Sequence, residues 1–213
     1  MKRLTTFLCL ALLAAASNAV AQQWDATGQA ALLKRDKAEL TEFDHWYSVP
    51  AVEGTVGHYW APHFKTEFEV GTAAEGTIDG EADVPVPGRS YPYYRYRQHK
   101  LRETTAGTTA IYQFFDNRWV HPFVGAGIEV ARERHVADSL PAGTVRVSTA
   151  VPTLFLPAVP AIDTVTYSVR PVLGGGFKFY VTPRAFVRTE FRTSIAAGQR
   201  AAMQWRGGIG FDF

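Results

Sequence analysis

The segment TVTYSVRPVLGGGFKFYVT (residues 164–182) alternates between apolar and polar positions along most of its length. One face carries the apolar residues Val165, Tyr167, Val169, Leu173, Phe177, Phe179 and Val181. The other face carries mostly polar residues, namely Thr166, Ser168, Arg170, Lys178 and Tyr180. A period of two predicts a β-strand, and this one is far longer than the roughly 5–6 residues of a typical strand.

The same alternation recurs on both sides of this segment. Strands are predicted near residues 49–60, 63–73, 93–115, 120–136, 164–181, 184–195 and 200–213. Single-chain bacterial membrane barrels usually have an even number of strands, so an eighth is expected. We expect it from 38–47, within a segment (22–47) that reads as either a periplasmic tail or a poor first strand.

Short and long connections alternate along the chain. Tight turns are predicted at 61–63, 116–118 and 182–184, whereas long polar or Pro-rich insertions occupy 74–92 and 137–163. Short turns on one side and long loops on the other are typical of outer-membrane barrels. The sequence therefore predicts an all-β fold, namely a transmembrane, antiparallel, up-and-down β-barrel of eight strands.

Such a barrel turns its apolar faces to lipid and its polar faces to the lumen. The residues predicted to form a lumen charge network are Lys65, Glu67, Glu69, Glu129, Arg170, Lys178, Arg188, Glu190, Arg192 and Arg206. An eight-stranded barrel has room inside only for side chains, so these charges are expected to pair and close the lumen. The alternative is a narrow channel for small or hydrophobic solutes, gated by rearrangement of the pairs.

The chain of 213 residues is of ordinary size for one domain, and its first 21 residues read as a secretory signal peptide. Lys2 and Arg3 precede an apolar run, and Ala19-Val20-Ala21 supplies the small residues before a cleavage site. Cleavage leaves the barrel domain, 22–213, with 20 basic and 20 acidic side chains and without Cys9. Zero net charge disfavours a nucleic-acid partner, and the loss of the thiol excludes disulfides.

Four pieces of the chain resemble a known family. They are GHYWAPHFKTE (57–67), WVHPFVGAG (119–127), GGGFKFYVTPR (174–184) and GIGFDF (208–213). Together they resemble the small bacterial outer-membrane β-barrel proteins of the OmpA/OmpX/OmpW-like, eight-stranded kind. The resemblance implies the outer membrane as location, and membrane lipids and lipopolysaccharide as surroundings. It also implies insertion by the barrel assembly machinery, with Trp205, Ile209, Phe211 and Phe213 as the assembly signal.

The sequence contains little that points to catalysis. Its six His residues lack metal-ligand spacing, so neither a metal nor another cofactor is expected. The nearest catalytic set is Glu133, His135, Asp138 and Ser139, which would be required by the alternative of a lipid-modifying outer-membrane enzyme. We expect instead a protein that is not an enzyme, with a structural or surface-interaction role and with the loops 74–92 and 137–163 as its contact surface.

Overall fold

A computed structural model describes residues 23–36, 46–84, 93–115, 117–145, 153–195 and 202–213. Its strands are β1 (Trp24–Asp36), β2 (Trp46–Ala61), β3 (Phe64–Ala73), β4 (Gly76–Val84), β5 (Tyr93–Gln113), β6 (Val120–Ala137), β7 (Gly143–Val145), β8 (Leu154–Leu156), β9 (Ile162–Tyr180), β10 (Ala185–Ser194) and β11 (Ala202–Asp212). Within these ranges no helix is long and apolar enough to cross a bilayer. The predicted signal peptide, 1–21, lies outside the described residues.

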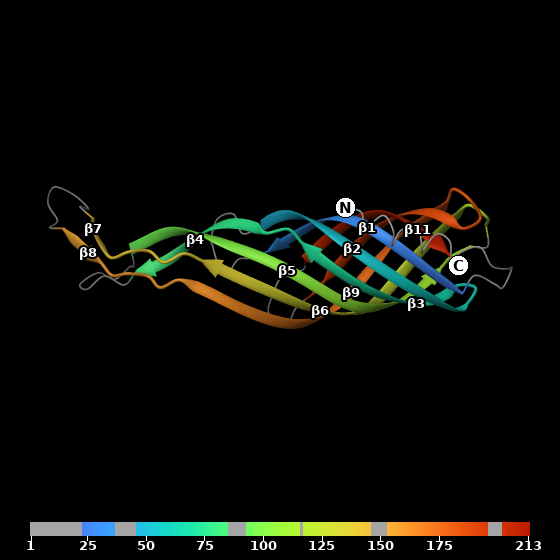
Figure 1. The fold of residues 1–213 in the computed structure, drawn as a ribbon, viewed down its shortest axis with the longest axis horizontal. Helices are drawn as coiled ribbons and strands as arrows, with labels where there is room; N and C mark the ends of the chain where they lie inside the picture. The colour runs from blue at the N-terminus through green and yellow to red at the C-terminus, as the bar shows by residue number, and fades with distance from the viewer. Residues whose placement is uncertain (1–22, 37–45, 85–92, 116, 146–152, 196–201) are drawn as a thin grey trace, which may run out of the picture.

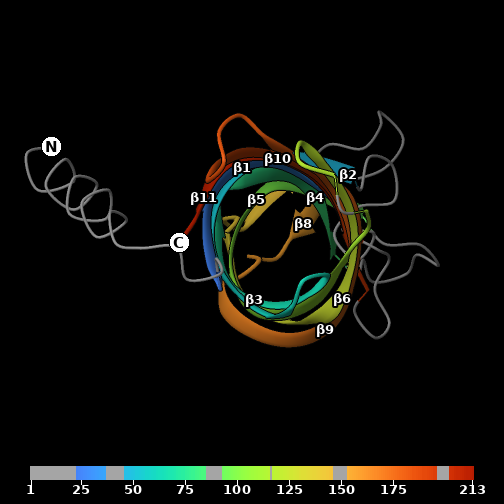
Figure 2. The ribbon, with the colours of Figure 1, turned by 90° about the vertical axis from the view of Figure 1, so that its right-hand side faces the viewer.

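Antiparallel neighbours close the sheet into a ring (Figure 2). The wall follows the order β1, β2, β3, β5, β6, β9, β10, β11, and β11 pairs back onto β1. β4 resumes the course of β3 after a break at Ala74 and Glu75, and it pairs with the first part of β5. The predicted up-and-down, eight-stranded barrel is thereby confirmed.

The eighth wall strand is β1, not the predicted 38–47 segment. β1 pairs with β2 along its whole length and with β11 from Asp25 to Lys34. Its lumen side carries Asp25, Thr27 and Gln29, but its outer side is mainly small residues such as Gly28, which hid the alternation. Residues 37–45 lie outside the described residues, and Trp46 already belongs to β2.

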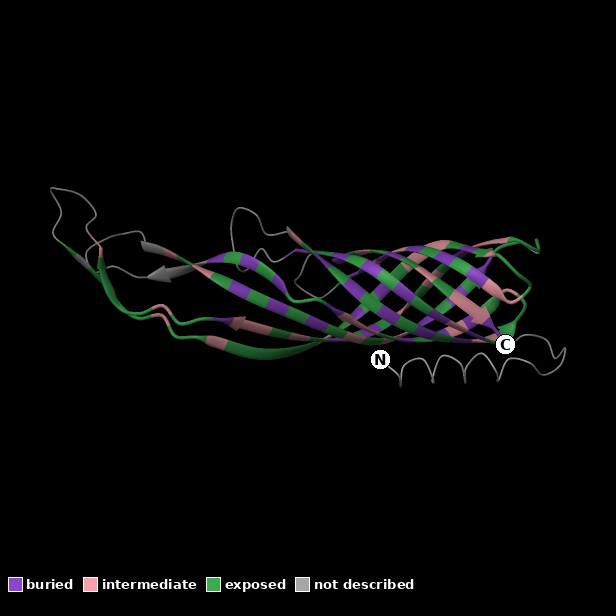
Figure 3. Cartoon of the chain, turned by 45° about the horizontal axis from the view of Figure 1, so that its top comes forward, coloured by how far each residue is buried: buried purple, intermediate pink, exposed green. Residues whose placement is uncertain are grey.

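Burial alternates along the strands (Figure 3), and many of the exposed side chains are large and apolar. On β9, Leu173 is 55% exposed, whereas Lys178 is 1% exposed. The exposed apolar side chains of the barrel include Val56, Phe68, Val70, Val124, Ile128, Val130, Phe177, Val187 and Ile209. A protein in water would bury these side chains and expose the charged ones. The reversed pattern is that of a barrel surrounded by lipid.

β4, β5, β6 and β9 continue well beyond the other strands and form an extension of the wall on one side (Figure 1). β5 has 21 residues and β9 has 19, compared with 10 residues in β3 and in β10. The predicted loop 74–92 therefore contains a strand, β4. The predicted loop 137–163 contains the short β7–β8 hairpin. Arg95 and Arg97 of β5 donate hydrogen bonds to the Pro141 and Pro160 carbonyls, which tie this connection to the extension.

The wall tolerates no side chain at Gly176, a lumen-side position of β9. A Cβ atom there would overlap the Thr189 carbonyl oxygen of β10, which is backbone and cannot rotate away. We expect Gly176→Ala to lower the free energy of unfolding by about 1–3 kcal/mol, the usual cost of overpacking. Urea unfolding in detergent micelles measures this. The control Gly54→Ala, where nothing lies within 4 Å of the added Cβ, is expected to change little, and equal stability of the two variants contradicts the prediction.

Candidate functional site: the charged lumen

The structure places all ten of the charged residues named above in the barrel interior, each no more than 6% exposed. They come from β3, β6, β9, β10 and β11. Sequence reasoning missed other buried charges, namely Asp25, Arg35, Asp36, Glu53, Glu103 and Asp212. Glu53 and Glu103 could have been found from the alternation along β2 and β5. Asp25, Arg35 and Asp36 lie on β1, whose strand pattern was not recognised.

A basal cluster fills the end of the lumen next to the short turns. It consists of Asp25, Tyr59, Lys65, Lys178, Tyr180 and Asp212. Lys178 Nζ lies 2.7 Å from Asp212 Oδ1 and 3.1 Å from Asp25 Oδ2, while Lys65 Nζ lies 2.5 Å from the same Asp25 oxygen. Tyr59 donates a hydrogen bond of 3.2 Å to Asp25, so this tyrosine points into the lumen. Each lysine is thereby neutralised.

The next contacts lead from the basal cluster toward the middle of the barrel. Lys65 also pairs with Glu67 at 2.5 Å, and Glu67 accepts from Arg188 at 2.5 Å. Arg188 reaches Glu190 at 2.8 Å. Its guanidinium carbon also lies 4.5 Å from the centroid of the Phe123 ring. Arg188 is therefore bound on two sides by carboxylates and on a third by an aromatic face.

A central cluster is built around two arginines from neighbouring strands. Its members are Glu53, Glu69, Glu129, Arg192 and Arg206. Both arginines pair with Glu69; Arg206 also lies 2.9 Å from Glu53, and Arg192 lies 3.4 Å from Glu129. A cavity beside Glu129 and Arg192 has a volume of only about 10 Å³. That is about the space of one water molecule.

The network continues to the outer end of the barrel. Arg170 lies 3.7 Å from Glu129 and 3.1 Å from Glu103, and Arg35 pairs with Glu103 and, at 2.6 Å, with Glu133. The opposite side of the lumen at this level is apolar, formed by Ala31, Leu33, Val49, Ala51, Ala73 and Ala202 with Tyr47 against them. Arg206 lies 4.0 Å from Glu190, which joins the central cluster to Arg188, so ion pairs run from the basal cluster to the base of the extension.

Two histidines lie side by side in the extension. His99 Nδ1 of β5 and His135 Nε2 of β6 are 2.7 Å apart, and the rings stack at 28°. Burial, followed by the neighbouring His135 and Arg97, lowers the pKa of His99 to about 4. The neutral form of His99 therefore belongs to the closed extension.

Acidification is expected to open the extension locally. The unfolded or opened segment binds a proton below pH ~6.5 whereas the closed segment does so only near pH 4, so stability falls as the pH drops through that window. The protection factors of amides in β4 and the first part of β5, which are the exchange rates corrected for the intrinsic effect of pH, are expected to fall between pH 7 and pH 5. His99→Gln is expected to lose much of this response. An unchanged pH response in His99→Gln contradicts the assignment.

The structure does not assemble the catalytic set considered from the sequence. Glu133 pairs with Arg35, and His135 stacks on His99, whereas Asp138 and Ser139 follow β6 at an exposed position. In the described ranges no three His, Cys, Asp or Glu side chains are grouped so that they could hold a metal ion.

The proposed assembly-signal residues lie on the outside of β11 and just after it. Trp205, Ile209 and Phe213 are exposed, and Phe211 is half-buried. Phe213 exchanges two backbone hydrogen bonds with Trp24, at 2.8 and 3.1 Å, which join the end of the chain to β1. Recognition of these residues by the assembly machinery stays a prediction.

An apolar exterior around a lumen of paired charges defines a transmembrane β-barrel. No protein-family model matches the chain, and no curated protein does. Solved structures match at low identity but over almost the whole chain. Neisserial surface protein A (NspA) is 14% identical, with a TM-score of 0.54 and coverage of 89% of this chain and 97% of its own.

Two further solved structures agree. OprG from Pseudomonas aeruginosa is 11% identical with a TM-score of 0.52, covering 91% of this chain and 96% of its own. Ail of Yersinia pestis, in complex with the heparin analogue sucrose octasulfate, is 7% identical with a TM-score of 0.51, covering 90% and 99%. The chain therefore has the fold of the small bacterial outer-membrane β-barrels. This agrees with the family resemblance and the outer-membrane location inferred from the sequence.

Proposed function

We propose that the protein is an outer-membrane barrel with a closed lumen and a structural or surface-interaction role. The observation that carries the proposal is the uninterrupted ion-pair network from Asp25 to Glu133. Buried charges of this kind are held in place by their partners, because removing one leaves another uncompensated. A lumen filled in this way serves as a core rather than a path for solutes.

The contact surface in this proposal is the extension, with β4, the first part of β5 and the β6–β9 connection. Its position beyond the barrel supports this assignment (Figure 1), as does the sulfated ligand bound by Ail, a barrel of the same fold. The surroundings would be outer-membrane lipids and lipopolysaccharide, with the barrel assembly machinery acting during insertion. The proposal includes neither catalysis nor a cofactor.

Single-channel recording in a planar bilayer tests the closed lumen. The mature protein, with folding verified by its faster gel migration when unboiled, is expected to give no steady openings. Reproducible openings altered by Arg188→Gln or Glu190→Gln would instead establish the narrow channel. Such a channel would favour cations, since the buried charged residues in the described ranges comprise nine carboxylates and seven Lys or Arg side chains.

A further inference from the structure

Four cationic side chains share the outer face of two neighbouring strands. Lys100 and Arg102 lie on β5, and Arg132 and Arg134 lie on β6; all four are exposed. Arg102 stands directly opposite Arg134 in the strand register, and Arg132 stands opposite Thr104, two residues further along β5. Like charges placed directly opposite each other destabilise a sheet. A bound anion would offset this repulsion.

The carboxylates nearby offset only part of this charge. Arg134 donates to both oxygens of Asp163 on β9, at 2.9 and 2.8 Å. Glu75 acts on Arg134 only from a distance. Within the described part of the chain, Lys100, Arg102 and Arg132 have no ion pair. Three cations thus remain available on one small area of the surface.

These cations lie directly above the lipid-facing belt. Along the outer face of β6, Ile128 and Val130 are exposed apolar residues, and Arg132 is the next outward position. Tyr167 of β9, 67% exposed, stands opposite Arg132. Tyrosine and arginine at the end of an apolar belt mark the level of the lipid headgroups, where phosphates lie.

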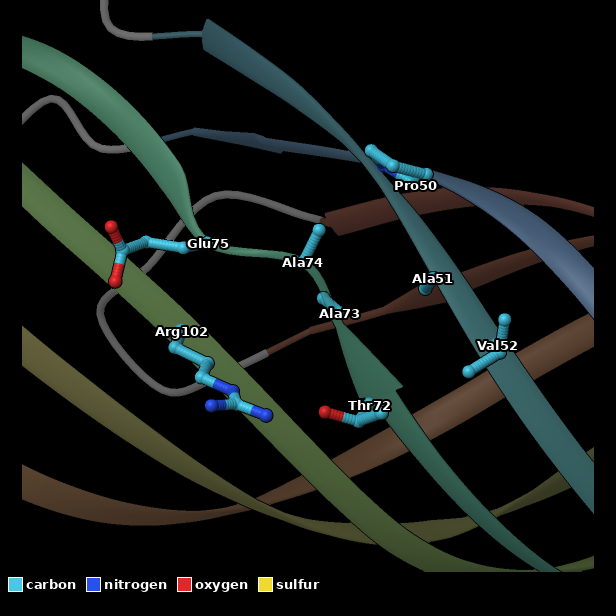
Figure 4. A pocket seen from close by; sticks show the side chains of 8 residues that line it. All are labelled: Pro50, Ala51, Val52, Thr72, Ala73, Ala74, Glu75 and Arg102. Carbon is cyan, nitrogen blue, oxygen red and sulfur yellow. The ribbon is translucent and has the colours of Figure 1, made fainter. Parts of the chain in front are cut away.

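A pocket of about 390 Å³ opens on the outside of the wall beside Arg102 (Figure 4). It forms where the β2–β3 pairing ends at Ala51 and Ala73 and β4 turns away to follow β5. Its lining consists of Pro50, Ala51, Val52, Thr72, Ala73, Ala74, Glu75 and Arg102. Arg102 and Glu75 lie on one side and Pro50 and Val52 on the other (Figure 4). The pocket is mainly apolar and carries the Arg102 cation and the Glu75 carboxylate at its edge; its apolar part suits a lipid chain, and Arg102 suits a phosphate of the headgroup.

We propose that this face binds one phosphorylated glycolipid of the outer leaflet, lipopolysaccharide. Lys100, Arg102 and Arg132 bind its phosphates, and one acyl chain occupies the pocket between β2 and β4. Charge-assisted bonds from arginine to phosphate supply the orientation. The inference rests on the outer-membrane location in the proposed function and names the surrounding lipid that the barrel selects.

Binding of lipid A to the full mature barrel in detergent, followed by native mass spectrometry, tests the proposal. Wild type is expected to hold one lipid A, and Arg102→Gln/Arg132→Gln to bind it about 30-fold more weakly, from about 1 kcal/mol per cation. The matched control Arg118→Gln/Arg184→Gln makes the same charge change at the short-turn end. It is expected to stay within about twofold of wild type.

The pocket has its own matched pair. Ala74→Trp fills it and is expected to weaken lipid A binding, whereas Ala126→Trp fills a separate outer groove of about 380 Å³ whose lining includes no cation. The proposal is overturned if Arg102→Gln/Arg132→Gln and Arg118→Gln/Arg184→Gln bind lipid A equally. It is also overturned if wild type binds dephosphorylated lipid A as tightly as lipid A. Displacement by inorganic phosphate at comparable concentration overturns it in favour of a free-phosphate site. Lipid binding is measured by mass spectrometry and lumen closure by conductance. The lipid-binding proposal can therefore fail without the closed-lumen proposal failing, and the reverse.

Discussion

Lys178→Met is expected to lower the free energy of unfolding by about 3–5 kcal/mol, the usual cost of leaving a buried charge without its partner. Lys178 Nζ lies within 3.1 Å of carboxylate oxygens of both Asp25 and Asp212. Methionine keeps the volume but removes the positive charge, so Asp212 loses its lysine partner and Asp25 keeps only Lys65. Urea unfolding in lipid vesicles, followed by tryptophan fluorescence, measures the loss.

Two further variants separate charge from packing at this site. Lys100→Met makes the same substitution at an exposed position and is expected to change stability by no more than about 0.5 kcal/mol. Lys178→Met/Asp212→Asn removes one of the uncompensated carboxylates and is expected to recover part of the stability. If Lys178→Met unfolds at the same urea concentration as wild type, the basal cluster does not hold the barrel together.

Arg192→Ala/Arg206→Ala is expected to prevent stable folding at neutral pH. Both guanidinium groups bind Glu69, and they also compensate Glu53 and Glu129, so their loss leaves several buried carboxylates together. Each uncompensated charge costs several kcal/mol. Several such charges together cost as much as the ~5–15 kcal/mol by which a domain is stable. The folded fraction by gel migration of unboiled samples measures the effect.

A rescue variant decides whether charge causes this defect. Adding Glu53→Gln and Glu69→Gln removes the orphaned charges without restoring the lost volume, and we expect it to restore much of the folded fraction. The rescued barrel is expected to remain silent in bilayers, because the basal cluster still fills the lumen. Arg118→Ala/Arg184→Ala, outside the lumen, is the matched control. A rescued barrel that conducts contradicts closure by the basal cluster.

The sequence predicts the fold well where the membrane imposes a two-sided pattern. Lipid on one side requires residues such as Leu173 and Phe177, and the lumen accepts Arg170 and Lys178, so a period of two results. This contrast weakens on β1, where Gly28 and Ala30 face lipid without being strongly apolar. On β4 the pattern is reversed, because Ile78 and Gly80 are buried whereas Thr77 and Asp79 are exposed, so this strand does not show the apolar outer face of a strand in the bilayer. The eighth barrel strand was therefore predicted at 38–47 instead of at β1, and β4 was predicted to be part of a loop.

The lumen network was predictable as a set of inward positions but not as a set of partners. Glu69 is separated from Arg192 and Arg206 by more than a hundred residues, and only the closed ring brings them together. The alternation placed Tyr180 on the polar face, but Tyr59 was hidden, since tyrosine is also common at the lipid boundary. Their hydroxyl groups face Asp25 and Asp212.

Because the strands differ in length, the end of the barrel that carries the extension is not symmetric about the barrel axis. Residues 93–101 of β5 pair with β4 rather than with the barrel strand β3, which at about 3.3 Å per residue is a length of about 30 Å along the strand. Among the described residues, β10 ends at Ser194 and β11 begins at Ala202, so neither has a comparable continuation there. In the proposed surface-interaction role, a large partner would contact the extension on one side of the barrel rather than all strands equally. Binding to the extension would therefore fix the rotation of the partner about the membrane normal.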